Sequence, residues 1–166
     1  MSEIQYIEIP NYTTISGKTM SINLSYQIFG CALHTAPIVL VNHALTGNSN
    51  VAGSQGWWSS LIGPNKAIDT DHYTVLAFNI PGNGYDDSLN NLIHNYKDFV
   101  ARDIAQLFLI GLQKLTVKQL FAAIGGSLGG GIAWEMAVLN PTIIQHLIPI
   151  ASDWKSTDWL IANCLI

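Results

Sequence analysis

LFAAIGGSLGGGIAWE, residues 120–135, carries the clearest indication of the fold in this sequence. It opens with a short continuous apolar run, Leu120 to Ile124, which is typical of a strand buried on both faces. A helical pattern over Leu128 to Leu139 follows, and Asn140-Pro141 is its stop signal. Between strand and helix lies Gly125-Gly126-Ser127-Leu128-Gly129, a G-x-S-x-G sequence in a strand-turn-helix context. The sequence predicts that the Ser127 hydroxyl projects from a sharp turn at the carboxyl edge of a sheet.

Steric crowding explains why glycine is needed on both sides of Ser127 in this turn. A serine at a sharp strand-to-helix turn is strained, and side chains at Gly125 and Gly129 would collide with neighbouring backbone. The N-terminal amides of the following helix point to the same place, where they favour a developing oxyanion. Ser127 is therefore the predicted nucleophile of an enzyme. Two other interpretations stay open: an ordinary serine in a glycine-rich turn, and a phosphate-binding loop, although the chain has no G-x-x-x-x-G-K-[ST] sequence.

Outward from this turn, strand patterns alternate with helix patterns. Apolar and polar residues alternate around the turn signal Ser16-Gly17-Lys18, at Ile7 to Ile9 and Ile22 to Ile28, which predicts an antiparallel hairpin. Helical spacing from Val100 to Leu115 predicts an amphipathic helix that packs on a sheet. The other runs typical of buried strands are Ile38–Val41, Tyr73–Phe78 and Leu147–Ala151. These patterns predict an α/β fold with a mostly parallel sheet in one domain over residues 1–166.

Composition limits the classes of function. Of the 166 residues, 49% are hydrophobic and 11% charged, which suffices for one core and suggests apolar surface that something else covers. The six lysines are scattered and Arg102 is the one arginine, so nucleic-acid binding is disfavoured. No apolar run approaches the ~20 residues that span a bilayer, and we expect a cytoplasmic protein without a membrane segment. Cys31 and Cys164 are interpreted as reduced, packed thiols, and no metal site is predicted.

Five segments carry a resemblance to a known family. They are VNHALTGNS at 41–49, GWW at 56–58, LIGPNKAIDT at 61–70, IGGSLGG at 124–130 and IPIAS at 148–152. In combination they closely resemble the homoserine O-acetyltransferase family, over about Leu24 to Ser152. The resemblance implies an α/β-hydrolase fold, a role in methionine biosynthesis, a cytoplasmic location and a homodimer in the full-length form.

The resemblance also implies roles for individual residues. Ser127 matches the nucleophile, which takes an acetyl group from the co-substrate acetyl-CoA and passes it to the hydroxyl of homoserine or a similar alcohol. Leu45 and Leu128 match the positions whose backbone amides form the oxyanion hole, in agreement with the general logic of this fold. No cofactor beyond that co-substrate is implied.

The sequence departs from the family in two places. Residues 79–87, NIPGNGYDD, replace a glycine-rich family stretch, which leaves the acceptor open. The family also continues beyond the point where this sequence ends, with a helical lid, the catalytic aspartate and the catalytic histidine. We therefore interpret residues 1–166 as the N-terminal part of a single domain that lacks the lid and the C-terminal strands. Because a serine needs a base to become a nucleophile, we expect this polypeptide alone to have little or no transferase activity.

The chain itself offers no credible base for Ser127. His43 precedes the serine, whereas the triad order of this fold is serine, acid, histidine, so His43 is predicted to be structural. His146 is predicted to be a packed or surface residue. Further residues are given no catalytic role: His34, His72, His94, Trp57, Trp58, Asp153 and Asp158. Two alternative functions stay open, a serine esterase or other hydrolase of the same fold, and a non-catalytic binding module.

Overall fold

The protein is described here by a computed structural model that covers residues 2–164. Its main feature is a six-stranded sheet with the order β1-β2-β6-β3-β7-β8. The strands of this sheet are β1 (Gln5–Thr13), β2 (Thr19–Gly30), β3 (Ile38–Asn42), β6 (Thr74–Phe78), β7 (Leu120–Gly126) and β8 (Ile144–Ile150). The short strands β4 (Ile62–Gly63) and β5 (Ile68–Asp69) form a separate pair. The helices are α1 (Ala101–Lys114), α2 (Leu128–Leu139) and α3 (Asp158–Cys164), with single 3-10 turns η1 (Leu89–Asn91) and η2 (Tyr96–Asp98).

The strand directions confirm the predicted architecture. β1 and β2 form an antiparallel hairpin, and β2 joins the rest of the sheet by antiparallel pairing with β6. The strands β6, β3, β7 and β8 run parallel to one another. The fold is therefore a mostly parallel sheet with an antiparallel hairpin at its N-terminal side, as the alternation of patterns predicted.

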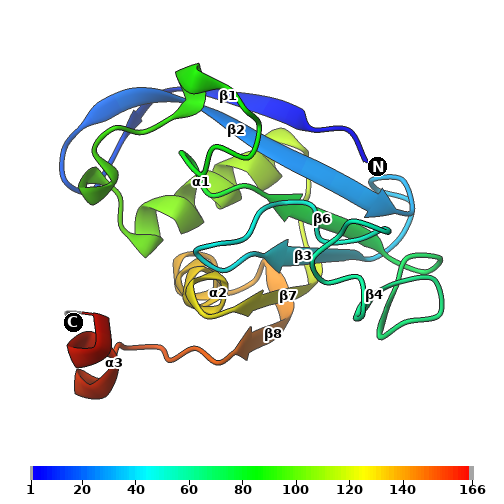
Figure 1. The fold of residues 1–166 in the computed structure, drawn as a ribbon. Helices are drawn as coiled ribbons and strands as arrows, with labels where there is room; N and C mark the ends of the chain where they lie inside the picture. Colours follow the sequence, from blue (N-terminus) through cyan, green and yellow to red (C-terminus); the bar gives the residue numbers. More distant parts are fainter. Residues whose placement is uncertain (1, 165–166) are drawn as a thin grey trace.

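The two faces of the sheet are covered by different parts of the chain (Figure 1). Helices α1 and α2 pack on one face, where Phe108 and Met136 are buried against the sheet. An ion pair of 2.7 Å between Arg102 Nε and Glu135 Oε2 links the two helices. The other face is covered by the long connection after β3, whose Val51 and Ile62 are buried in a second apolar cluster.

The connections of two neighbouring strands diverge at the carboxyl edge of the sheet. The connection after β3 passes to one face, whereas helix α2, which follows the neighbouring strand β7, lies on the other. Adjacent parallel strands whose connections diverge in this way leave an opening beyond their carboxyl ends, where α/β proteins place their ligands. The ends of β3 and β7, at Asn42 and Gly126, therefore define where a site is to be expected.

Asp103 links the N-terminal hairpin to helix α1. Its side chain is fully buried, and its Oδ1 accepts hydrogen bonds of 2.9 Å from the Tyr12 hydroxyl and the Ile15 amide. Its Oδ2 accepts a bond of 3.0 Å from the amide of Val100 at the start of the helix. Burial, followed by the bond to Asp103, raises the pKa of Tyr12 well above its usual value. The carboxylate thus satisfies buried donors from two distant parts of the chain.

Replacing Asp103 with alanine is expected to lower the free energy of unfolding by about 2 kcal/mol, because the buried Tyr12 hydroxyl and two partly buried amides lose an acceptor. Tyr12 keeps a second acceptor in Gln106 Oε1, at 2.8 Å. The measurement is urea unfolding, with Asp153→Ala as the matched control, since Asp153 is exposed and should shift stability by less than about 0.5 kcal/mol. Equal stability of the two variants would contradict the structural role assigned to Asp103.

The structure corrects one expectation and adds three elements. The last strand begins at Ile144, three residues before the predicted start, and it is not buried on both faces. Ile148 and Ile150 are 42% and 41% exposed, because β8 is an edge strand of the described sheet. Neither the β4-β5 pair nor α3 was predicted, and Asp158 is the first residue of α3. Within residues 2–164, none of the helices has both the length and the apolar character to cross a membrane.

Candidate active site

Ser127 occupies a strained turn between β7 and α2. Its backbone has φ of +51° and ψ of −119°, a conformation that a residue with a side chain adopts at a cost of about 1–3 kcal/mol. The turn is held in place on both sides, since the Ser127 amide donates to the Ile150 carbonyl of β8 at 2.9 Å and the Ser127 carbonyl accepts from the Gly130 amide at 3.0 Å. The side chain of Ser127 is exposed at the carboxyl edge of the sheet. Such strain at an exposed hydroxyl is typical of nucleophilic serines in this position.

The glycines on either side permit this turn for the steric reason that the sequence suggested. A Cβ on Gly125 would overlap the backbone of Gly129, and a Cβ on Gly129 would overlap the carbonyl oxygens of Asn42 and His43. The first turn of α2 is therefore in direct contact with the end of β3. This contact brings the segment after Asn42 next to Ser127, although the two are 85 residues apart in the sequence.

The amides of Leu45 and Leu128 are both available to an external acceptor. Within residues 2–164, neither N–H donates a backbone hydrogen bond. Leu128 is the first residue of α2, so its amide belongs to the unpaired donors at the positive end of the helix dipole. Leu45 lies in the turn after β3, where its side chain is 75% exposed. Both positions therefore remain predicted oxyanion donors, and their environment permits that role.

His43 is a buried structural residue with both ring nitrogens in use. The Ile80 amide, which can only donate, bonds to Nε2 at 3.0 Å, so the proton of the neutral ring resides on Nδ1. Nδ1 then donates to the Ala44 carbonyl at 2.7 Å. Burial lowers the pKa of His43, which keeps the ring neutral. The ring therefore links the end of β3 to the segment after β6 and is not free to serve Ser127 as a base.

The other histidines also lie away from Ser127. His34 Nε2 is 3.3 Å from the Thr116 hydroxyl, and His146 is exposed on β8 with its ring 4.9 Å from that of Phe121. His94 lines a cavity of about 550 Å³ between β2 and the segment 79–98, and neither Ser127 nor Leu45 lines that cavity. Among the histidines of the described chain, none is hydrogen-bonded to Ser127.

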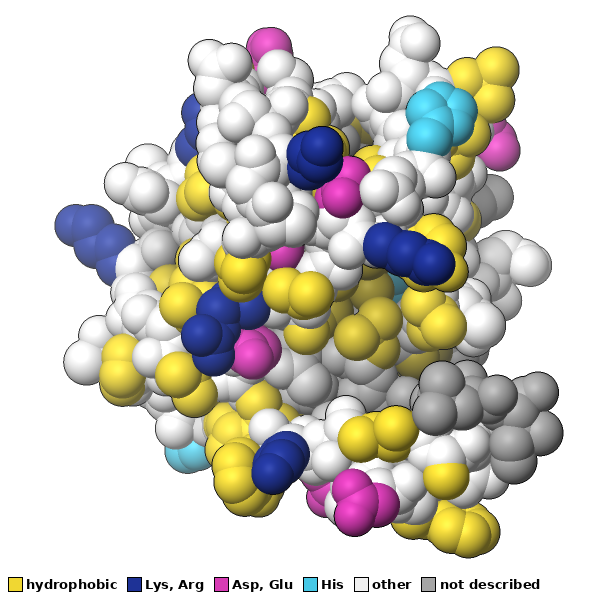
Figure 2. Space-filling model, turned by 90° about the vertical axis from the view of Figure 1, so that its left-hand side faces the viewer, with side chains coloured by type: hydrophobic (Ala, Val, Ile, Leu, Met, Phe, Trp, Pro, Cys, Tyr) yellow, Lys and Arg dark blue, Asp and Glu magenta, His cyan; other side chains and the backbone are white. Residues whose placement is uncertain are grey.

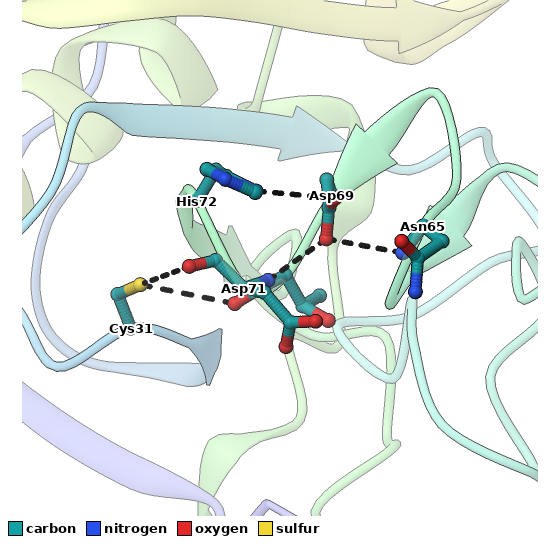
Figure 3. A network of polar contacts seen from close by, with 6 residues as sticks. Cys31, Asn65, Asp69, Asp71 and His72 are labelled. Carbon is teal, nitrogen blue, oxygen red and sulfur yellow. Dashed lines mark hydrogen bonds and ion pairs between the residues drawn. The ribbon is translucent and has the colours of Figure 1, made fainter.

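The fifth histidine belongs to a polar cluster that precedes β6 (Figure 3). Asp69 accepts from the Asp71 amide at 2.9 Å, and it pairs with His72 Nδ1 at 3.1 Å. The bond from Asp71, reinforced by Asn65 and His72, lowers the pKa of Asp69. The Cys31 thiol is directed at the carbonyl of Asp71 at 3.5 Å and is free, whereas the side chain of Cys164 lies outside the described part. The cluster shapes a turn, and the described residues contain no group of His, Cys, Asp and Glu suited to a metal ion.

A buried polar network beneath the loops was not predicted. Asn79, directly after β6, accepts from the Ser49 amide at 2.8 Å and donates to the Ser49 and Ser25 hydroxyls, each at 2.9 Å. Ser49 in turn donates to Gln27 of β2 at 2.7 Å. This network holds the connection after β3 against β2 and β6. The signal in the sequence was Asn79, a polar residue directly after a buried strand.

The surface around the carboxyl edge is apolar and hollowed. The arrowheads of β3 and β8 point to the left of Figure 1, and Figure 2 shows that side of the molecule. Hydrophobic side chains gather there around a hollow above the C-terminal helix α3. The exposed apolar residues of the chain include Leu45, Ile150, Trp154, Trp159 and Ile161. Trp57, 41% exposed, stacks on Trp58 at 4.9 Å between ring centroids.

The fold and the strained serine turn together define a class of protein. The model of the alpha/beta hydrolase fold family matches residues 37–162, and the chain belongs to this family. The predicted fold class is thereby confirmed.

Relatives of this chain include homoserine O-acetyltransferases. It is 34% identical over 160 residues to a homoserine O-acetyltransferase of Moorella thermoacetica. The aligned region covers 86% of this chain and 42% of the relative. It is 32% identical to a homoserine O-acetyltransferase of Trichormus variabilis, over 96% of this chain and 46% of the relative. The predicted resemblance is confirmed, and the chain spans less than half the length of these curated relatives.

Solved structures include two kinds of enzyme. The homoserine O-acetyltransferase of Staphylococcus aureus superposes with a TM-score of 0.82 at 26% identity, over 96% of this chain and 49% of that one. The structure of esterase E22 superposes with a TM-score of 0.83 at 28% identity, over 98% of this chain and 50% of that one. Transferase and esterase thus share this half of the fold.

Proposed function

We propose that the complete natural polypeptide containing this chain is an acyltransferase that moves an acetyl group from acetyl-CoA to the hydroxyl of homoserine or a similar alcohol. The observation that carries the proposal is the Ser127 turn, which has positive φ, an exposed hydroxyl and two unbonded amides, those of Leu45 and Leu128, in the adjoining segments. The relatives above 30% identity support the transferase assignment.

The reaction proceeds by double displacement. The Ser127 Oγ attacks the thioester carbonyl of acetyl-CoA while a base removes its proton, and the resulting oxyanion is stabilised by the Leu45 and Leu128 amides. The C–S bond then breaks, and the CoA thiolate takes up the proton. In the second half, the acceptor hydroxyl attacks acetyl-Ser127 and gives its proton to the same base. The bond between the acetyl carbon and Ser127 Oγ then breaks, Oγ takes the proton back from the base, and the acceptor leaves as its O-acetyl ester. Each oxyanion donor typically lowers the barrier by ~3 kcal/mol.

Because no histidine of residues 2–164 is bonded to Ser127, the proposal assigns the base and its orienting acid to the part of the relatives' length that this chain does not span. Residues 1–166 would then be the nucleophile-bearing part of a single domain. A lid would cover the apolar surface around the carboxyl edge, in a cytoplasmic homodimer.

The proposal is tested by the fate of the acetyl group. We expect the complete polypeptide to release CoA in a burst from acetyl-CoA and to convert homoserine to its O-acetyl ester, measured by stopped-flow thiol detection and mass spectrometry. The 166-residue chain alone, as the control, is expected to show little or no turnover, because it offers Ser127 no bonded base. Release of free acetate at the same rate with and without homoserine would contradict the transferase assignment.

That same outcome would favour the second candidate function, a serine esterase. The similarity to esterase E22 supports this alternative. The two functions differ in whether water or an alcohol reaches the acyl-serine, and the fold alone does not separate them.

A further inference from the structure

Three features outside the proposed chemistry were candidates for a further role: the cavity beside β2, the polar cluster around Asp69, and the buried ring of His43. Polar residues of the cavity lining hydrogen-bond to one another, and so do those of the Asp69 cluster. Within residues 2–164, none of these contacts indicates a ligand. His43 instead bonds to the Ala44 carbonyl, which belongs to the same peptide group as the Leu45 amide, one of the proposed oxyanion donors.

We propose that His43 is a positioning residue that orients the Leu45 amide for the acyl-transfer reaction. This inference rests on the proposed function. It concerns a single peptide unit, because the Ala44 carbonyl and the Leu45 N–H belong to the same planar group and point in opposite directions. Fixing the direction of the carbonyl oxygen therefore fixes the direction of the N–H.

The Ala44 carbonyl is fixed by two donors. His43 Nδ1 donates to it at 2.7 Å and the Gly47 amide donates to it at 2.9 Å, on the same oxygen. With both acceptor sites of the carbonyl occupied, the Ala44-Leu45 peptide cannot rotate without breaking two hydrogen bonds. The Leu45 N–H, which has no backbone acceptor within residues 2–164, is left pointing away from the turn.

The ring itself is fixed at its far side. Nε2 accepts from the Ile80 amide at 3.0 Å, and the ring is 1% exposed, so it has no freedom to turn. Gly47 packs directly against it, since a Cβ on Gly47 would lie 2.9 Å from the His43 Cβ. The backbone after β6 thus holds the ring, and the ring holds the peptide that carries the oxyanion donor.

The neutral state is essential to this arrangement. Nε2 can accept from Ile80 only when it carries no proton, and burial lowers the pKa of His43, which favours that state. A glutamine at position 43 can still accept from Ile80 but cannot place a rigid donor at the Nδ1 position. An asparagine can donate near the Nδ1 position but does not reach Ile80.

The test compares these two variants in the complete natural polypeptide. His43→Gln is expected to lower the rates of acylation and deacylation roughly 100-fold, the effect of losing one oxyanion donor, with KM for acetyl-CoA changed little. His43→Asn is expected to recover part of that loss because it restores a donor to the Ala44 carbonyl. His72→Gln is the matched control, since His72 lies in the Asp69 cluster and should retain the wild-type rate. A folded His43→Gln protein that acylates within twofold of wild type would overturn the inference.

A second measurement needs no variant to remain folded. Nitrogen-15 chemical shifts of the histidine rings in the wild-type polypeptide are expected to show His43 protonated on Nδ1 alone at neutral pH. A ring protonated on Nε2 would overturn the inference. Failure of the proposed function looks different: the wild-type protein would then either form no acyl-enzyme at Ser127 or release free acetate at the same rate with and without homoserine.

Discussion

Replacing Ser127 with alanine is expected to abolish formation of the acyl-enzyme in the complete natural polypeptide, with a fall in kcat on the order of 10⁶-fold. The alanine variant has no atom that can form the ester, whereas its backbone and the neighbouring amides are unchanged. The remaining activity would come from binding and the oxyanion donors alone.

The measurement is labelling with a fluorophosphonate probe, followed by peptide mass spectrometry and by the acetyl-CoA assay. Ser60→Ala is the matched control, because Ser60 is exposed and lies outside the turn. Labelling that persists in Ser127→Ala would exclude this serine as the nucleophile. Absence of labelling in the wild-type polypeptide would instead favour a binding module without catalysis.

Replacing Gly129 with alanine is expected to lower the stability of the protein, and this is the second large effect. A methyl group here would overlap the carbonyl oxygens of Asn42 and His43, so the first turn of α2 and the end of β3 must separate. Because these atoms are backbone in a packed region, they cannot move cheaply, and we expect the free energy of unfolding to fall by about 3 kcal/mol. Urea unfolding measures this change.

Gly131→Ala provides a control in the same helix. A methyl group at Gly131 would meet only the Ser152 hydroxyl, at 3.9 Å, which is ordinary van der Waals contact. Alanine also loses less conformational entropy than glycine in a helix, so this variant is expected to gain about 0.5–1 kcal/mol. A Gly129→Ala variant as stable as Gly131→Ala would show that the contact with β3 does not limit position 129.

The boundaries of most elements followed closely from local patterns, and those of β8 and of the N-terminal hairpin followed less well. The helix predicted over Leu128 to Leu139 has these bounds in the structure, and the strand predicted from Leu120 extends two residues further, to Gly126. The last strand was predicted to be buried on both faces, as its apolar run suggests. That prediction was wrong, because burial depends on what packs beside a strand, and β8 has a neighbour on one side only among the described strands.

The candidate site was predicted in part. Ser127 and its glycines formed a recognisable local signal, and the predicted structural role of His43 agrees with its two backbone bonds. The network around Asn79 and Ser49 was not predicted, because it joins three segments that no spacing rule connects: β2, the connection after β3 and the segment after β6. The roles of Leu45 and Leu128 remain predictions that the Ser127 and His43 experiments address.

The bend at Ser127 could be predicted from local sequence, since the glycines at 125 and 129 permit the close backbone approach that a G-x-S-x-G turn between an apolar run and a helical one requires. The groups that face this bend depend on contacts between segments far apart in the sequence. The pairing of β3 with β7 places Asn42 opposite Gly125, and the Ile80 amide determines which nitrogen of His43 carries the proton. Contacts of this kind depend on strand order and on backbone groups that every residue possesses, so the identities of the side chains alone do not specify them.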